Sequence, residues 1–185
     1  DGGSIRVWAT KDEESGWYGT LRGQRYSSDN QAIGEEFTVA NGKSNVPEQA
    51  ESDLGNFGFN RFYDDLIPNP QVAVLSDGGW IVIYAGEIYG SFRGFFGQRY
   101  DADGASIGNE IQLVSVSFGD STENNWDNLS VTGLPDGGWV MAWQGWGIYQ
   151  EGIFAQKFDS IGDKVGDVFQ TLDIQNVDLI GEPQV

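Results

Sequence analysis

One series of sequence landmarks occurs three times along this chain, and this repetition limits the folds open to it more than any other feature. Each copy has an Asp-Gly-Gly triplet, an apolar run with aromatic residues, a segment like Gly-Gln-Arg-Tyr and a later segment that opens near a glycine. The triplets occupy residues 1–3, 77–79 and 136–138, so successive copies start 76 and 59 residues apart. Repeats of this length are typical of propellers, solenoids and other arrays, in which no unit buries its apolar face alone. The chain is therefore predicted to be a single repeat domain, with units at about residues 1–69, 70–128 and 129–185.

The middle copy has the residue pattern of four short antiparallel strands. Asp-Gly and Gly-Gly pairs provide the positive φ angles that tight hairpins require, so the runs on either side of residues 77–79 are predicted to pair. The predicted strands cover residues 71–75, 80–84, 95–100 and 110–114. No segment has the apolar period of an amphipathic helix. The expected fold is all-β, with three repeats of about four antiparallel strands arranged as β-propeller-like blades. These blades are either part of a larger ring or form a ring that self-association completes.

Both ends of the chain fall inside a repeat unit. Asp1 begins at the hairpin turn, whereas residues 183–185 have the Pro-Gln-Val sequence with which the middle unit opens at residues 70–72. In propellers, such an offset allows the last strand to complete the blade that was begun at the other end of the chain. Open blade faces leave apolar patches in water, so other copies of the chain or neighbouring repeats are the expected partners.

The composition excludes several classes of function. With 28 acidic and 10 basic residues, the formal charge is −18, which repels a phosphate backbone and argues against nucleic acid as a partner. The same charge favours divalent cations. The chain contains no cysteine and no histidine, which removes thiol nucleophiles, Ser-His triads and the common zinc sites. No apolar run in the sequence is long enough for a transmembrane segment.

Asp101 and Asp103 are the candidate metal ligands. They place two carboxylates at alternate positions of a predicted turn, an arrangement that calcium uses when further oxygen atoms come from the backbone or from a neighbouring loop. The residues that follow do not complete an EF-hand loop, and the corresponding turns of the other two copies each keep one aspartate. The alternative is that these two residues form only a turn.

Two sets of repeated charged residues are predicted to be structural. The aspartate of each triplet is expected to bond the backbone of its own turn, and these residues are Asp1, Asp77 and Asp136. A cation on the third strand of each copy is expected to bond a neighbouring carboxylate, and these residues are Arg25, Arg99 and Lys157.

The aromatic residues fall into two groups. Those that begin or end the second strand are expected to pack between blades, and they are Trp8, Trp80, Tyr84, Trp139 and Trp143. The others are predicted to lie in loops, where exposed aromatic faces beside polar side chains suit the binding of sugar rings. These candidate ligand-binding residues are Trp17, Tyr89, Trp126, Trp146 and Tyr149.

The middle copy also carries a longer pattern, which runs through residues 70–73, 77–80, 96–104 and 108–110. In this pattern the units resemble the tandem repeats of large secreted bacterial surface and adhesin-like proteins, which are often described as calcium-binding and associated with RTX-type modules. The resemblance covers the matching segments of all three copies and departs from the family in the long segments 41–69 and 115–128. It implies an extracellular array protein, with calcium as the expected cofactor, and it implies no catalytic activity.

The sequence thus favours a non-catalytic module of a secreted or surface-displayed protein, which acts in adhesion or assembly and is stabilised by calcium. One alternative is a lectin-like carbohydrate-binding module that uses the loop aromatics. The other is a fragment of a glycan-active enzyme, which requires a pair of carboxylates at a set separation. Nothing in the sequence selects such a pair.

Overall fold

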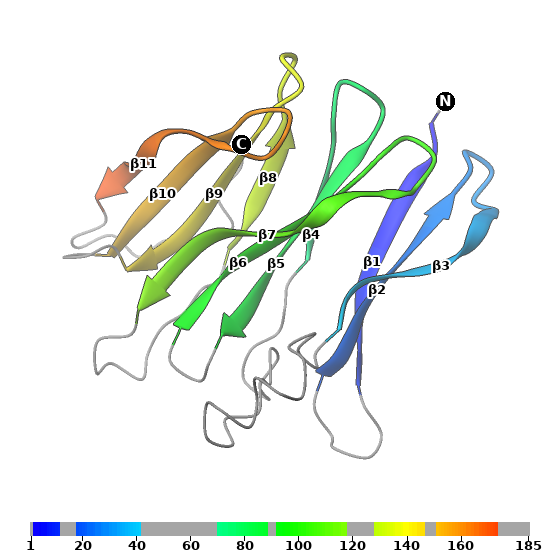
Figure 1. Cartoon of the computed structure of the whole chain (residues 1–185), viewed down its shortest axis with the longest axis horizontal. Coiled ribbons are helices and arrows are strands. Elements are labelled where there is room, and N and C mark those ends of the chain that lie inside the picture. Colours follow the sequence, from blue (N-terminus) through cyan, green and yellow to red (C-terminus); the bar gives the residue numbers. More distant parts are fainter. Residues whose placement is uncertain are drawn as a thin grey trace. The chain divides into compact units, whose positions relative to one another are not determined.

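A computed structural model of the chain describes residues 2–11, 18–41, 70–88, 92–117, 128–146 and 151–173. Within these ranges every regular element is a β-strand, and the strands form three separate sheets (Figure 1). The strand pairs are antiparallel. The prediction of an all-β chain with antiparallel sheets is confirmed. None of the described residues belongs to a helix that is long and apolar enough to cross a membrane.

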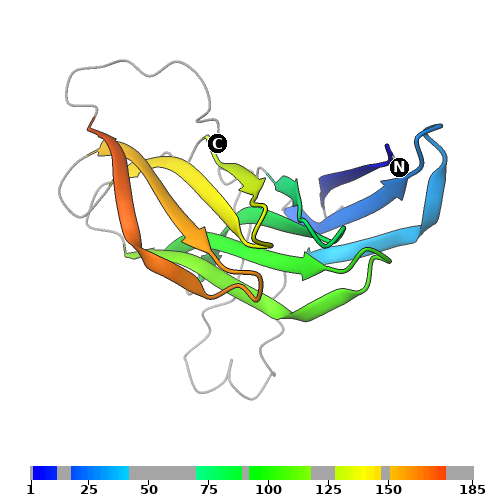
Figure 2. The ribbon, with the colours of Figure 1, turned by 90° about the horizontal axis from the view of Figure 1, so that it is seen from above.

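Each sheet is a meander in which strands that follow one another along the chain also pair with one another. The first sheet consists of β1 (Ser4–Lys11), β2 (Tyr18–Tyr26) and β3 (Ala32–Asn41). The second consists of β4 (Gln71–Val74), β5 (Trp80–Ile88), β6 (Phe92–Tyr100) and β7 (Ser106–Ser117). The third consists of β8 (Ser130–Gly133), β9 (Trp139–Trp146), β10 (Glu151–Phe158) and β11 (Lys164–Asp173). Figure 2 shows the strand order within each sheet from a second direction.

Several strands are longer than the apolar runs that predict them. β5 continues to Ile88 and β9 to Trp146, so Tyr84 and Trp143 lie inside their strands instead of at the ends. The reason is visible in the pairing of β9 with β10, which continues from Trp143 through Gly145 to Trp146. A strand ladder needs only backbone N–H and C=O groups, so it extends past the last apolar side chain.

The described chain divides into two compact units, and the second sheet contributes to both. The first unit comprises residues 1–70, 84–96 and 112–118, and the second comprises residues 71–83, 97–111 and 119–185. In the first unit, the ring of Tyr84 on β5 stacks on that of Phe96 on β6, with 6.1 Å between ring centroids. Leu21 of β2 is fully buried in this unit.

The core of the second unit is built on two identical aromatic stacks. Trp80 stacks on Tyr100 in the second sheet, and Trp139 stacks on Phe158 in the third, each with 5.5 Å between ring centroids. In both cases the tryptophan begins the second strand and its partner ends the third strand of the same sheet. Each of these tryptophans therefore stacks on the neighbouring strand of its own sheet, a contact that the prediction of packing between blades does not include.

One buried glutamine in each sheet joins the strand that carries it to the strand that follows. The side-chain Nε2 of Gln156 donates to the backbone carbonyl oxygens of Lys157, Val165 and Gly166, at 2.9, 3.4 and 3.2 Å. Gln24 and Gln98 make the same three contacts at the same sequence offsets. In the third sheet the pairing register jumps at this point, because Ala155 pairs with Phe169 but Lys157 pairs with Val165. The glutamine amide therefore fills a β-bulge, whose extra residues leave carbonyl groups without ladder partners.

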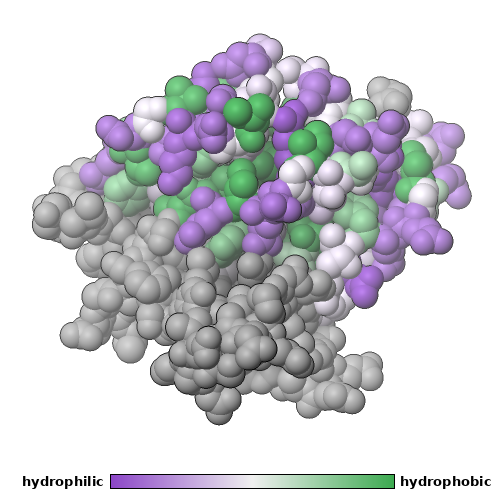
Figure 3. Space-filling view, in the orientation of Figure 1, coloured by the Kyte–Doolittle hydropathy of each residue, from purple (hydrophilic) through white to green (hydrophobic). Residues whose placement is uncertain are grey.

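Apolar residues are not confined to the core. Within the described ranges, large hydrophobic side chains with more than two fifths of their surface exposed are Ile33, Val74, Ile107, Ile161, Val165, Val168 and Phe169. On the face that Figure 3 shows, apolar and hydrophilic residues are mixed over the described part of the chain.

Candidate functional site

The Asp-Gly-Gly triplets form tight hairpin turns of one type. In the second sheet, Gly78 N donates to Leu75 O at 3.0 Å and Leu75 N donates to Gly79 O at 2.8 Å. The turn at Leu134–Gly138 has the same two bonds, at 3.1 and 2.8 Å. The first glycine of each triplet has a positive φ, of 84° at Gly78 and 88° at Gly137. This is a type I turn closed by a residue in the left-handed region, where glycine has no steric penalty.

The second glycine of each triplet is required for a different reason. A Cβ atom on Gly79 would lie 2.4 Å from the carbonyl oxygen of Tyr100, and one on Gly138 would lie 2.3 Å from that of Phe158. In the first sheet, a Cβ on Gly3 would lie 2.7 Å from the carbonyl oxygen of Tyr26. The end of the strand that pairs next to the triplet, β2, β6 or β10, therefore passes so close that only glycine fits.

The aspartate of the triplet connects the turn to a cation. Oδ1 of Asp77 accepts a hydrogen bond from Gly79 N at 3.0 Å, and Oδ1 of Asp136 accepts one from Gly138 N at 3.1 Å. The second carboxylate oxygen forms an ion pair, with Arg99 in the second sheet and with Lys157 in the third, where the distance is 2.7 Å. Both predictions for these residues, a bond to the turn backbone and a bond to the cation, are confirmed. Asp1 lies outside the described residues.

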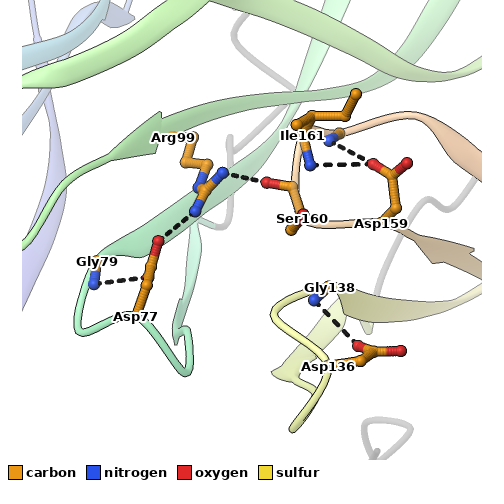
Figure 4. A network of polar contacts seen from close by, with 9 residues as sticks. Asp77, Gly79, Arg99, Asp136, Gly138, Asp159, Ser160 and Ile161 are labelled. Carbon is orange, nitrogen blue, oxygen red and sulfur yellow. Dashed lines mark hydrogen bonds and ion pairs between the residues drawn. The ribbon is translucent and has the colours of Figure 1, made fainter.

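Arg99 makes one contact that Lys157 does not make among the described residues. Its second guanidinium nitrogen donates to the backbone carbonyl oxygen of Ser160, in the turn between β10 and β11 (Figure 4). One guanidinium thus holds a carboxylate of its own sheet and a carbonyl of the next sheet, which suits the two-armed donor geometry of arginine. The Arg99 side chain is 14% exposed, compared with 37% for Lys157.

The ion pair in the third sheet changes the ionisation of its carboxylate. The hydrogen bond from Lys157, with a further bond from Gly138 N, lowers the pKa of Asp136 below its ordinary value. Elsewhere in the second unit, burial raises the pKa of the Tyr100 hydroxyl, and the charge of Glu110 raises it further.

Asp101 and Asp103 lie in the turn between β6 and β7. Oδ1 of Asp101 accepts hydrogen bonds from Asp103 N at 3.0 Å and from Ala105 N at 2.8 Å. In the third sheet, Oδ1 of Asp159 accepts three such bonds, from Ile161 N, Gly162 N and Asp163 N. The side chain of the first aspartate of this turn therefore accepts backbone hydrogen bonds in both sheets. Among the described residues, no group of three or more acidic side chains is close enough to hold a metal ion.

Most of the aromatic candidates for ligand binding fall outside the described residues. These are Trp17, Tyr89, Trp126 and Tyr149. Trp146 is the last residue of β9, where it pairs with Glu151, so its predicted position in a loop is wrong. The pairing of β9 with β10 extends to the end of the strand and includes this residue.

Sequence reasoning missed the glutamine of the third strand and the separate role of the second glycine. Both had a signal, since each occupies the same position in all three copies. The described site has a structural role, because it connects turns and strands. Its carboxylates, cations and amides bind one another and the backbone of their turns.

The chain matches no family model, and no curated protein matches it. Among solved structures, it is similar to the endo-arabinase from Bacteroides thetaiotaomicron VPI-5482, with 13% identity and a TM-score of 0.31. That match covers 90% of this chain and 80% of the endo-arabinase chain. At this TM-score, the similarity carries no argument about the function of the chain.

Proposed function

We propose that this chain is a non-catalytic module of β-propeller-like repeats that acts in adhesion or assembly, outside the cell or on its surface. The observation that carries the proposal is the contact of Arg99 with both the Asp77 carboxylate and the Ser160 carbonyl. The repeated charged residues are used to fasten turns and to join one sheet to the next. This is the use expected of residues in a repeat array, whose units are stabilised by their neighbours.

The contact between the first strands of the second and third sheets supports a blade-like arrangement within the second unit. β4 and β8 contact one another, and a Cβ on Gly133 would lie 2.2 Å from the carbonyl oxygen of Val74. In a propeller, the first strands of neighbouring blades approach one another around a central axis. The close approach at Gly133 is the geometry that such an arrangement requires.

Calcium belongs to this proposal as a stabilising ion. The support is the formal charge of −18 and the presence of two aspartates in the turn after β6. Oδ1 of Asp101 accepts two backbone bonds, which fixes the carboxylate in the turn, and oxygen ligands held in this way are the kind that calcium takes.

Beads coated with the chain test the proposed function. We expect coated beads to clump together or to be retained on surfaces bearing glycans or matrix proteins, whereas beads coated with an unrelated acidic protein of equal charge are not. Hydrolysis of a glycan substrate by the chain, without clumping or retention, would overturn the proposal.

A further inference from the structure

The junction between the second and third sheets follows a simple rule, which is visible within the second unit. The second sheet contributes a cation and an aliphatic side chain, and the third sheet contributes a turn that receives both. The cation is Arg99, which donates to the carbonyl oxygen of Ser160. The aliphatic side chain is Ile111 of β7, whose Cδ1 would lie 2.9 Å from a Cβ on Gly162. The glycine is thus needed to admit Ile111 against the turn.

Trp139 completes the receiving side of this junction. Its ring lies 3.4 Å from the same Cβ position on Gly162, so the glycine is enclosed between the tryptophan of its own sheet and Ile111 of the neighbouring sheet. Trp139 is fully buried. The contribution of each sheet can therefore be recognised by position. The second sheet contributes the cation of its third strand and the residue three places after the glycine of its fourth strand. The third sheet contributes the Ser160–Gly162 turn.

The third sheet presents the same contributing face, but this face is exposed. Phe169 stands three residues after Gly166, as Ile111 stands three residues after Gly108, and these two glycines have φ angles of 74° and 67°. Phe169 is 52% exposed, and the neighbouring residues of β11 are exposed as well, although Val168 points to the opposite face of the sheet because it is adjacent to Phe169 in the strand. At the position of Arg99, the third sheet has Lys157. The third sheet therefore presents an exposed aromatic ring and a partly exposed cation at the positions that contribute to the internal junction.

The first sheet presents a receiving turn of the same form. Ser27 N donates to Gln31 O at 2.8 Å and Asn30 N donates to Ser27 O at 2.9 Å, with Asn30 at a φ of 61°. In this turn Ser28 takes the place of Ser160, and Asn30 takes the place of Gly162. Ser28 and Asn30 are exposed, as is Ser4, which stands where the third sheet has Trp139.

We propose that the exposed face of the third sheet docks head to tail on the first sheet of a second copy of this chain. The inference rests on the proposed function, since it treats each sheet as a repeat that joins to the next by one rule. Lys157 of one copy then takes the part of Arg99 and donates to the Ser28 carbonyl of the other copy. Phe169 stands at the position of Ile111. Because Asn30 fills the space that Gly162 leaves open in the internal junction, the Phe169 ring packs over the Asn30 side chain and over the Arg6 guanidinium that donates to it.

At one pair of positions the residues of the two junctions have reversed sizes. The internal junction pairs a large ring on the receiving side, Trp139, with the smaller Ile111. The junction between copies pairs the small Ser4 on the receiving side with the larger ring of Phe169. The first sheet also carries a partner for that ring, because the guanidinium of Arg6 is stacked 4.2 Å above the ring centroid of Tyr26 and is exposed. Aromatic rings pack well on an arginine that is already held in a plane.

A head-to-tail contact is heterologous, so it uses two different faces of the same chain. This property separates it from an association in which two apolar faces meet. A variant at Phe169 and a variant at Ser4 are therefore expected to lie on opposite sides of one contact.

Sedimentation velocity over a range of protein concentrations tests the docking. We expect the unmodified chain to associate as concentration rises, and we expect Phe169→Asp to raise the midpoint of association by about 10-fold or more, as for a central aromatic contact. Val74→Asp is the matched control, because Val74 is 65% exposed and lies on β4 of the second sheet, which takes no part in the docking. A chain that stays monomeric at about 100 μM, or an equal effect of the two variants, would overturn the proposal.

Engineered cysteines identify the two faces directly, because the chain contains none of its own. A mixture of Ser4→Cys and Phe169→Cys chains is expected to form the mixed disulfide in preference to either homodimer. A random distribution of the three products contradicts head-to-tail docking. If the chain sediments as a monomer but its coated beads clump or are retained, the docking is wrong and the proposed function is supported. If the chain associates but its beads neither clump nor are retained, the docking is supported and the proposed function is wrong.

Discussion

Arg99 and Ser160 stand 61 positions apart in the chain, yet a guanidinium nitrogen of Arg99 donates to the backbone carbonyl of Ser160. The same guanidinium holds the Asp77 carboxylate. Asp77 in turn accepts a bond from Gly79 N. A single side chain therefore connects a hairpin turn of the second sheet with a hairpin turn of the third. Several expectations about stability depend on this connection and on its counterpart at Lys157.

Replacement of Arg99 should destabilise the chain more than replacement of Lys157. We expect Arg99→Ala to lower the free energy of unfolding by about 1–3 kcal/mol, since it removes charge-assisted bonds from a largely buried group. Lys157→Ala removes one exposed ion pair and should cost about 1 kcal/mol or less. Urea denaturation of the two variants measures the difference. Equal losses would contradict the role of Arg99 as the connection between sheets.

The second glycine of a triplet should be more sensitive to substitution than a glycine that is required only for its positive φ. Gly79→Ala places a Cβ 2.4 Å from the Tyr100 carbonyl oxygen and should cost more than any variant that strains only the backbone. The control is Gly108→Ala, where φ is +67° and no atom lies within 4 Å of the Cβ position. That control should cost about 1–2 kcal/mol. The denaturation midpoints compare the two, and a smaller loss for Gly79→Ala would contradict the close approach of the third strand.

The buried glutamine of each sheet should be sensitive to truncation. Gln156 is 1% exposed and donates to three backbone carbonyls, so Gln156→Ala leaves bulge carbonyls without that donor. We expect a loss of about 1–3 kcal/mol in the free energy of unfolding. Gln112→Ala, at an exposed position of β7, is the matched control and should change it by about 0.5 kcal/mol or less. Similar values for the two variants would show that the glutamine does not pin the strands.

The ion pair of Asp136 predicts a specific dependence of stability on pH. Because the pKa of Asp136 is lowered in the folded state, the unfolded chain binds the proton more readily as the pH falls. The contribution of this carboxylate is therefore complete above the unfolded pKa of about 3.9 and is lost as the pH falls through the lower folded value. Urea midpoints of the unmodified chain and of Asp136→Asn, measured from pH 7 to pH 3, should converge at the acidic end. Curves that stay parallel would contradict the contribution of the ion pair.

Calcium should raise the melting temperature of the chain if it binds at the turn after β6. The expected increase grows with the logarithm of calcium concentration above the dissociation constant and disappears with EDTA. Asp103→Asn should weaken the response, whereas Asp29→Asn, in the corresponding turn of the first sheet with its single aspartate, should not. An unchanged melting temperature at saturating calcium would remove the ion from the proposed function.

The parts of the fold that sequence reasoning predicts well are those determined within a few residues. Asp77 and Gly78 specify their turn through their own backbone preferences, so the hairpin and its hydrogen bond could be expected from the sequence. The cation on the third strand could also be assigned to a carboxylate, because an acidic chain offers few other roles for a repeated cation. Strand pairing followed from the turns.

What could not be predicted depends on distances between separate strands. The need for Gly79 arises from the carbonyl of Tyr100, which is distant in sequence and reaches the turn only after β5 and β6 have paired. The role of Gln156 depends on the register jump between β10 and β11, which no local pattern reveals. Aromatic burial gives no direction, so the sequence does not predict that Trp139 stacks on Phe158 within one sheet.

The glycine at position 162 has a consequence for how such a chain evolves. A sheet that offers this small residue leaves room for an aliphatic side chain of its predecessor, as Gly162 does for Ile111. The residues on both sides of the junction can therefore stay the same when a whole repeat is gained or lost by duplication or deletion of its gene segment. Lineages built on this joint are free to lengthen or shorten by complete modules while every remaining module keeps its shape.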